Sequence, residues 1–210
     1  MVDLDQLAAC TAGFGADLLA LQEVDVGVPR SGRADQPTVV ARATGMEAVF
    51  GRAHRVGGVG KYGNALLARG PISEVEVQRL PKTARHHEPR AAILATVHLD
   101  GRPLSVAATH LSIHRPEVLD QLATVVAALA TRPPPLLLLG DLNLLPEEVA
   151  PVVEAAGLTL VGGEPTFPAP EPRIRIDHLA VAGLTAGPAA VVATPCSDHR
   201  ALVVDLEHQA

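Results

Sequence analysis

The sequence predicts an α+β fold in which two packed sheets carry helices on their outer faces. Many short apolar runs end in Gly, Pro or Asp, and several are joined by short connections typical of antiparallel strands, as at Asp100-Gly101. Three or four segments with apolar residues at helical spacing lie between these runs. Because each sheet and each helix must bury one face, these elements indicate a layered sandwich of two mainly antiparallel sheets.

The helices follow from capping residues and helical periodicity. Asp3 can cap a helix over residues 4–13, and further helices are expected over residues 38–43, from Pro116 to the proline run, and from Pro146 to Gly157. The strands follow from short apolar or alternating runs bounded by turn residues. They are expected at residues 18–21, 47–52, 65–68, 72–80, 91–99, 104–108, 136–139, 158–161, 173–176, 191–193 and 201–206.

The composition limits which classes of protein this chain can belong to. With 210 residues and no linker, one domain over residues 1–210 is expected, with an interior of Ala, Val and Leu because aromatic residues are only 2%. A net charge of −6 and no basic stripe disfavour a protein that grips long nucleic-acid backbones, although a bound divalent cation would offset part of that charge. The oligomeric state is not visible in the sequence.

The cysteines and the hydropathy bear on the compartment. Cys10 and Cys196 lie far apart in the sequence without metal-type spacing, which favours free thiols in a reducing compartment. No apolar run approaches the roughly 20 residues that span a bilayer, and no secretory leader opens the sequence. A cytoplasmic protein is therefore expected, unless an upstream signal has been lost.

Polar residues collect where the expected strands end. The run Leu136 to Leu139 reads as a fully buried strand, and it breaks into Gly140-Asp141-Leu142-Asn143, which places a carboxylate and an amide at the rim of the core. The other sites of this kind are Glu23, His110 and Asp177 after strands, and Asp198 with His199 before one. Since antiparallel strands start and end on the same edge, all can share one rim.

This set of residues suits metal-assisted hydrolysis of phosphate esters. Carboxylates favour Mg²⁺ or Mn²⁺, a His oriented by a carboxylate can take a proton from water, and neutral donors stabilise charge on phosphate oxygens. Each residue alone also fits a bland interpretation. Glu23 and Asp25 fit solvated loop acids, His110 fits a satisfied core histidine, and Asp177-His178 fits an ordinary exposed pair, which is the preferred interpretation of His178. Together the strand-end residues favour a site.

The residues also carry a resemblance to a known family. The segments that carry it are Leu21-Gln22-Glu23-Val24-Asp25, Gly63-Asn64, Thr109-His110-Leu111-Ser112, Gly140-Asp141-Leu142-Asn143, Arg175-Ile176-Asp177-His178 and Ser197-Asp198-His199. In this order they resemble the motifs of the endonuclease/exonuclease/phosphatase superfamily, from about residue 17 to 199. The resemblance implies a four-layer α/β sandwich with metal-dependent phosphohydrolase activity.

The resemblance also implies roles for single residues. Glu23 would be a principal Mg²⁺ (or Mn²⁺) ligand, Asp198 would lie on or near the metal, and Asp141 would position a nucleophile or the metal. His199 would be the general base, oriented by Asp177, and His110 would stabilise the transition state or assist the leaving group. Asn143 would contact the scissile phosphate, and Asn64 and Arg90 match positions where the family places substrate-side polar groups.

One departure from the family pattern concerns the first strand. The family normally begins with a central strand carrying an Asn that helps to hold the metal, whereas here a helix is expected almost from Met1. A missing interior strand would leave backbone groups without partners, so a start placed too far downstream is favoured over a genuine short form.

The sequence thus predicts a hydrolase of phosphodiesters or phosphomonoesters. A phosphorylated metabolite, a nucleotide or a lipid head group fits equally well as substrate. A nuclease acting on DNA or RNA is the alternative within the same chemistry, disfavoured because Tyr62 and Phe167 are the only aromatic candidates near the pocket. A catalytically inactive binding module is the alternative from another class, and the retained base with its orienting carboxylate speaks against it.

Overall fold

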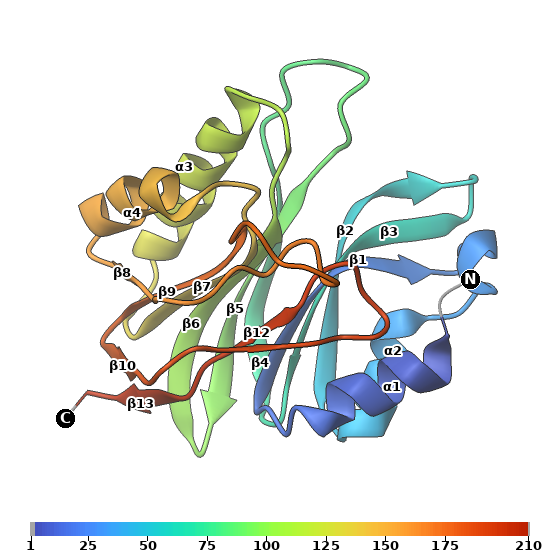
Figure 1. Cartoon of the computed structure of the whole chain (residues 1–210), viewed down its shortest axis with the longest axis horizontal. Coiled ribbons are helices and arrows are strands. Elements are labelled where there is room, and N and C mark those ends of the chain that lie inside the picture. Colours follow the sequence, from blue (N-terminus) through green and yellow to red (C-terminus); the bar gives the residue numbers. More distant parts are fainter. Residues whose placement is uncertain (1–2, 210) are drawn as a thin grey trace.

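Two sheets face each other at the centre of the molecule, and a pair of helices covers the outer face of each (Figure 1). The computed structural model describes residues 3–209. One sheet has three strands in the order β1-β3-β2, and the other has six in the order β4-β5-β6-β7-β9-β8. All of their neighbouring strands are antiparallel except β6 and β7. The predicted four-layer sandwich is therefore confirmed.

The helices lie close to their predicted positions. They are α1 (Leu4–Gly13), α2 (Gln36–Thr44), α3 (Glu117–Ala130) and α4 (Pro146–Ala155), with a 3-10 helix η1 (Pro29–Ser31). The Asp3 carboxylate caps α1 as expected, since it accepts hydrogen bonds from the amides of Asp5 and Gln6. α1 and α2 cover the three-stranded sheet, and α3 and α4 cover the six-stranded sheet.

The strands of the two main sheets are β1 (Leu18–Val26), β2 (Glu47–Val56), β3 (Gly60–Ala68), β4 (Ile72–Arg79), β5 (Ala91–Leu99), β6 (Arg102–His110), β7 (Leu136–Asp141), β8 (Thr159–Leu160) and β9 (Asp177–Ala182). Two small sheets near the C-terminus are formed by β10 (Leu184–Ala186) with β13 (Leu206–His208), and by β11 (Ala190–Val192) with β12 (Ala201–Val203).

Packing on both faces of β7 explains why Leu136 to Leu139 form an unbroken run of leucines. Leu136 and Leu138 pack outward against α3 and α4, whereas Leu137 and Leu139 pack inward against the facing sheet. Because successive side chains of a strand alternate between its faces, a strand covered on both sides must be apolar at every position.

Some predicted elements are wrong. The strand expected at residues 173–176 is a loop with one isolated bridge, and β9 begins only at Asp177. The strand expected at 201–206 is split between β12 and β13, which pair with different partners. The glycine-rich segment Val56–Gly60, for which no strand was expected, closes the β2–β3 hairpin, with Val56 opposite Gly60. The expectations failed where pairing partners distant in sequence decide the strand bounds.

Candidate active site

Three polar residues form one row across neighbouring strands at the rim of the six-stranded sheet. His110 ends β6, Asp141 ends β7 and Asp177 begins β9, and the register pairs His110 with Asp141 and Asp141 with Asp177. Asp177 was expected at the end of a strand and instead lies at the start of one. Since β9 runs antiparallel to β7, it still reaches the same edge, so the sequence-predicted rim exists.

Gly140 permits the close approach of β6 and β7 beneath this row. Its φ is +143°, and a Cβ there would overlap the backbone carbonyl of Thr109 on β6. Only glycine allows both this backbone conformation and the contact. The position of the Asp141 carboxylate beside His110 therefore depends on a glycine one residue earlier.

His199 completes the row from the loop before β12. Its Nδ1 lies 2.8 Å from Oδ2 of Asp177, and its Nε2 lies 3.9 Å from Oδ2 of Asp141. Burial lowers the pKa of His199, but the hydrogen bond and charge of Asp177, followed by the charges of Asp141 and Asp198, raise it to a net value of about 9. The Phe167 ring packs against the imidazole, with centroids 4.8 Å apart. The Asp177 carboxylate therefore lies in hydrogen-bond contact with this imidazole, and the base role that the family resemblance implies for His199 stays a prediction.

His110 is neutral and has a defined tautomer. Burial, followed by the charges of Arg90 and His199, lowers its pKa to about 3. Nη1 of Arg90 lies 3.0 Å from Nδ1 of His110 and can only donate, so Nδ1 accepts and Nε2 carries the hydrogen. That Nε2 lies 3.3 Å from Oδ2 of Asp141. His110 thus presents a neutral N–H donor to the rim.

Asp141 lies between the two imidazoles and next to a second carboxylate. Burial, followed by the charge of Asp177, raises the pKa of Asp141 to about 7. Ligand atoms of Asp141, Asp177 and His199 all lie within 4.8 Å of one another, a spacing that fits a single metal ion. A cation there would offset two neighbouring carboxylates and relieve their repulsion, and oxygen ligands suit Mg²⁺ or Mn²⁺.

The other two predicted metal ligands lie outside this cluster. Gln22 and Glu23 form a bulge in β1, where φ of Glu23 is +59°, and the bulge turns the Glu23 side chain outward until it is 64% exposed. Its Oε1 is 3.9 Å from Nδ1 of His110, so Glu23 shares the rim. Asp198 is exposed, and its backbone carbonyl accepts a hydrogen bond from the Ala169 amide.

The predicted substrate-side residues are all engaged with the protein. Asn64 is buried and its Nδ2 donates to the carbonyl of Ala91 at 2.9 Å. Nδ2 of Asn143 donates to the carbonyl of Leu111 at 3.0 Å, and its backbone N–H donates to Asp141. Arg90 contacts His110, with its Nη1 3.0 Å from Nδ1 of the imidazole. The roles of these residues toward a substrate stay predictions.

Two residues near the site, His178 and Asp25, are buried and not exposed to solvent as the simpler interpretation of the sequence predicts. His178, taken as exposed, is only 1% exposed: it bonds the Leu144 carbonyl through Nε2 and Arg175 through Nδ1, and burial lowers its pKa to about 4. Asp25 is buried and paired with Arg30 at 2.8 Å, so it is neither a solvated acid nor part of the row. Arg175 was missed by the sequence reasoning. Arg175 alternates with Ile174 and Ile176 in the sequence, and this alternation was the available signal that its side chain points to a different side from theirs.

The fold and the row of residues define a class of protein: a two-sheet sandwich with a His–carboxylate site on one rim. The profile of the Endonuclease/Exonuclease/phosphatase family matches residues 2–199, and the chain belongs to this family. A comparison with curated protein sequences found no match. Of the described residues, none forms a helix long and apolar enough to cross a membrane.

Solved structures share the fold at low sequence identity. A mannosyl-6-phosphatase from Bacteroides thetaiotaomicron has a TM-score of 0.78 at 16% identity, covering 97% of this chain and 91% of that one. A D. rerio TDP2 humanized by 14 mutations has a TM-score of 0.72 at 20% identity, with coverages of 97% and 92%. The human Nocturnin catalytic domain with bound sulfate has a TM-score of 0.74 at 19% identity, with coverages of 99% and 88%.

Proposed function

We propose that this chain is a metal-dependent phosphoric ester hydrolase in which His199 is the general base. The bond of 2.8 Å between His199 and Asp177 is the observation that carries this proposal, because a binding module needs no base with an orienting carboxylate. Membership of the Endonuclease/Exonuclease/phosphatase family supports the same class of reaction.

The chain's own residues divide the chemistry between them. His199 takes the proton from the attacking water at Nε2, while Asp177 accepts the hydrogen bond from Nδ1–H and stabilises the imidazolium that forms. His110 donates its Nε2–H to a phosphate oxygen in place of Asp141. Asp141 and Asp177 would hold Mg²⁺ or Mn²⁺, with Glu23 and Asp198 as the further predicted ligands, and the ion would supply charge stabilisation and a more acidic water.

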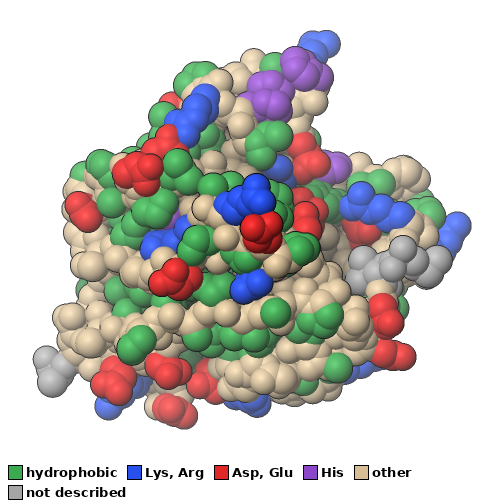
Figure 2. Space-filling model, in the orientation of Figure 1, with side chains coloured by type: hydrophobic (Ala, Val, Ile, Leu, Met, Phe, Trp, Pro, Cys, Tyr) green, Lys and Arg blue, Asp and Glu red, His purple; other side chains and the backbone are tan. Residues whose placement is uncertain are grey.

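Small phosphorylated molecules are the proposed substrates: a metabolite, a nucleotide or a lipid head group. The net charge is −6, and on the face shown in Figure 2 the basic side chains are scattered among acidic ones without forming a continuous strip. Phe167 and Tyr62 give little aromatic surface for stacking bases. The names of two similar structures, a mannosyl-6-phosphatase and a Nocturnin domain with bound sulfate, are consistent with a site for phosphate-like groups.

Hydrolysis of bis-p-nitrophenyl phosphate and of p-nitrophenyl phosphate, with Mg²⁺, with Mn²⁺ and with EDTA, tests the proposal. We expect metal-dependent turnover that is lost in His199→Ala and retained in His86→Ala, a matched variant at an exposed histidine of the β4–β5 loop. Preferential cleavage of plasmid DNA or RNA would favour the nuclease instead. Metal binding without turnover of any of these substrates would favour the binding module.

A further inference from the structure

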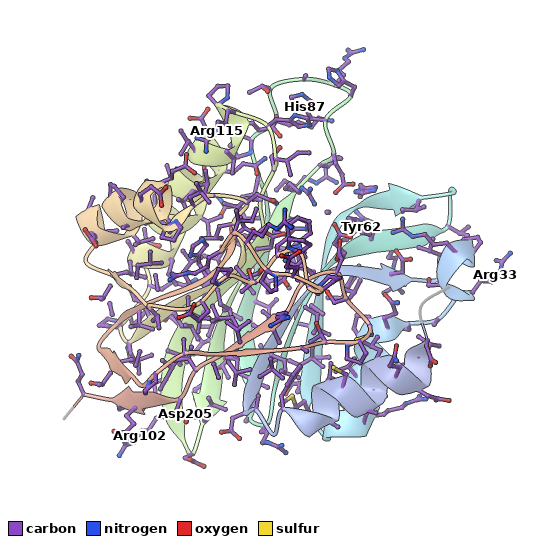
Figure 3. All side chains as sticks on the ribbon, in the orientation of Figure 1. Arg33, Tyr62, His87, Arg102, Arg115 and Asp205 are labelled. Carbon is purple, nitrogen blue, oxygen red and sulfur yellow. The ribbon has the colours of Figure 1, made fainter. Side chains whose placement is uncertain are left out.

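The loop between β4 and β5, residues 80–90, projects beyond the two sheets and is held by a buried carboxylate of α3 (Figure 1). Glu117 is fully buried, and its Oε2 accepts hydrogen bonds from the amide of Thr83 at 2.7 Å and from the hydroxyl of Thr83 at 2.9 Å. The same Oε2 lies 2.8 Å from Nδ1 of His87, which is labelled in Figure 3. Because a buried carboxylate needs donors, these contacts hold Thr83 and His87 at defined positions.

Further contacts hold the same part of the loop. The imidazole of His87 stacks on that of His114, with ring centroids 3.8 Å apart and planes inclined by 12°. Nε2 of Gln121 on α3 donates to the carbonyl of Pro81 at 2.8 Å. Nζ of Lys82 donates to the carbonyl of His87 at 3.1 Å. The loop is therefore held in place as far as His87.

The next residue, Glu88, connects this loop to the candidate active site. Its Oε1 lies 2.7 Å from Nη1 of Arg90, and that same nitrogen lies 3.0 Å from Nδ1 of His110. An Nη nitrogen of arginine carries two hydrogens, so Nη1 can donate one to Glu88 and the other to His110. Because the guanidinium is planar, two acceptors on one nitrogen fix its orientation. A series of contacts thus runs from α3 through the loop to His110.

The pair of Glu88 and Arg90 is partly removed from water. The side chain of Arg90 is 10% exposed, and that of Glu88 is 44% exposed. Fully exposed ion pairs contribute little because solvent screens them, whereas a nearly buried guanidinium needs acceptors to offset its lost hydration. Nε of Arg90 is buried and has no hydrogen-bond partner within residues 3–209, so the orientation of the guanidinium depends on the contacts of Nη1 with Glu88 and His110.

Glu23 is a competing acceptor for this guanidinium. Its Oε1 lies 3.9 Å from Nδ1 of His110, and Nη1 of Arg90 lies 3.0 Å from the same Nδ1. Without Glu88, the guanidinium can turn toward Glu23, and His110 then loses its donor at Nδ1. The same movement would neutralise Glu23, a predicted metal ligand. The contact with Glu88 opposes both changes.

We propose that Glu88 is a positioning residue that acts on His110 through Arg90, and that Glu117 fixes Glu88 through His87. The proposal rests on the proposed function in one respect, the use of the Nε2–H of His110 as a donor to phosphate. The orientation of Arg90 itself does not depend on any reaction, so it can be measured without substrate.

The first test measures the orientation of Arg90 by NMR. An arginine gives separate ¹⁵N signals for Nη1 and Nη2 when its guanidinium is held, and one averaged signal when it rotates freely. We expect two signals for Arg90 in the native chain and one in Glu88→Gln, with the signals assigned by their loss in Arg90→Met. Glu171→Gln is the matched control, because Glu171 pairs with Arg173 at 2.8 Å on the surface. One averaged signal in the native chain, or two signals in Glu88→Gln, would overturn the proposal.

The second test concerns the contact between Glu117 and His87. His87→Phe keeps a ring that can stack on His114 and removes the hydrogen bond to Glu117. We expect the two Nη signals of Arg90 to merge in this variant, as they do when Glu88 is changed. Two separate signals would overturn the role assigned to Glu117.

The third test measures what the positioning contributes to hydrolysis of bis-p-nitrophenyl phosphate. We expect kcat to fall about tenfold in Glu88→Gln, with KM changed by less than about twofold, because the loss falls on a group used in the transition state. Adding Glu88→Gln to Arg90→Met should give no further fall, and additive losses would overturn the proposal. A native chain without turnover would count against the proposed hydrolase alone, because the Nη signals still decide whether Glu88 orients Arg90.

Discussion

Replacing Asp177 with Asn removes the charge that faces His199 while nearly preserving the size of the side chain. In the native protein the Asp177 carboxylate accepts from Nδ1 of His199 at 2.8 Å and is the first contributor to raising the pKa of His199 to about 9, against the lowering effect of burial. Raising the pKa of His199 from 6.5 to about 9 corresponds to roughly 3 kcal/mol of stabilisation of the imidazolium relative to the neutral ring. In Asp177→Asn we expect the pKa of His199 to fall toward its ordinary value of 6.5.

The sign of the stability effect follows from the same values. A histidine whose pKa is raised in the folded state contributes stability that is fully present below pH 6.5 and is lost as pH rises through about 9. The metal-free native protein should therefore lose up to roughly 3 kcal/mol from this source between pH 6.5 and 9.5, and Asp177→Asn should lose little. Urea unfolding in EDTA at the two pH values measures the difference.

Activity should fall for a second reason. An Asn amide that donates to Nδ1 favours the tautomer with hydrogen on Nε2, which cannot take a proton from water. A general base usually contributes about 10²–10⁴-fold, and we expect a loss of that size in kcat/KM on bis-p-nitrophenyl phosphate.

An NMR titration of the His199 ring and the pH–rate profile check these expectations, with Asp120→Asn, at an exposed acid of α3, as the matched control. If Asp177→Asn retained a His199 pKa above 8 and lost less than about tenfold in kcat/KM, the assignment of base and orienting carboxylate would be wrong.

Three further perturbations test neighbouring parts of the structure. Gly140→Ala should destabilise the protein by roughly 2–4 kcal/mol in urea unfolding, because its Cβ would overlap the Thr109 carbonyl at a φ that Ala rarely adopts; unchanged stability would contradict the geometry. Glu117→Ala should cost about 3–5 kcal/mol, since this fully buried carboxylate bonds His87 at 2.8 Å, and Glu117→Gln should cost less; equal costs would argue against the buried pair. Because the pKa of Asp141 is about 7, calorimetry should show roughly tenfold tighter Mg²⁺ binding at pH 8 than at pH 6, and equal affinities would exclude Asp141 as a ligand.

Local sequence patterns predicted most of the fold because they report burial directly. The leucines of β7 indicate a strand covered on both faces, and Asp3 marks the first helical turn of α1. The positions of His110 and Asp141 were predictable for the same reason, because a polar residue that abruptly ends an apolar run must lie at the edge of the core. Asp177 lies in the same row, although it begins β9 instead of ending the expected strand.

The features that the sequence did not predict depend on contacts between distant segments. His178 reads as polar, yet it is buried because Arg175 and the Leu144 carbonyl satisfy both ring nitrogens. Cys10 and Cys196 are 186 positions apart in the sequence and are both free, but the Cys10 thiol, after burial, helps to raise the pKa of Cys196, which makes them neighbours. No local pattern encodes such pairs, because their partners are set by the packing of α1 against the C-terminal segment.

The two sheets contribute different residues to the site, so weak metal binding can be told apart from loss of the His199–Asp177 pair. His110, Asp141 and Asp177 stand on strands that are paired on both sides, so the His199–Asp177 bond should persist in residues 1–210. Glu23 stands on the bulge of β1 and its side chain is 64% exposed, so the protein holds it at the rim less firmly than the buried Asp141. A chain that shows the raised pKa of His199 but binds Mg²⁺ weakly would therefore keep the His199–Asp177 pair and lack a firmly held Glu23 ligand. A chain whose His199 titrates near 6.5 lacks the Asp177 contact, and that outcome, like metal binding without turnover, counts against the proposed hydrolase.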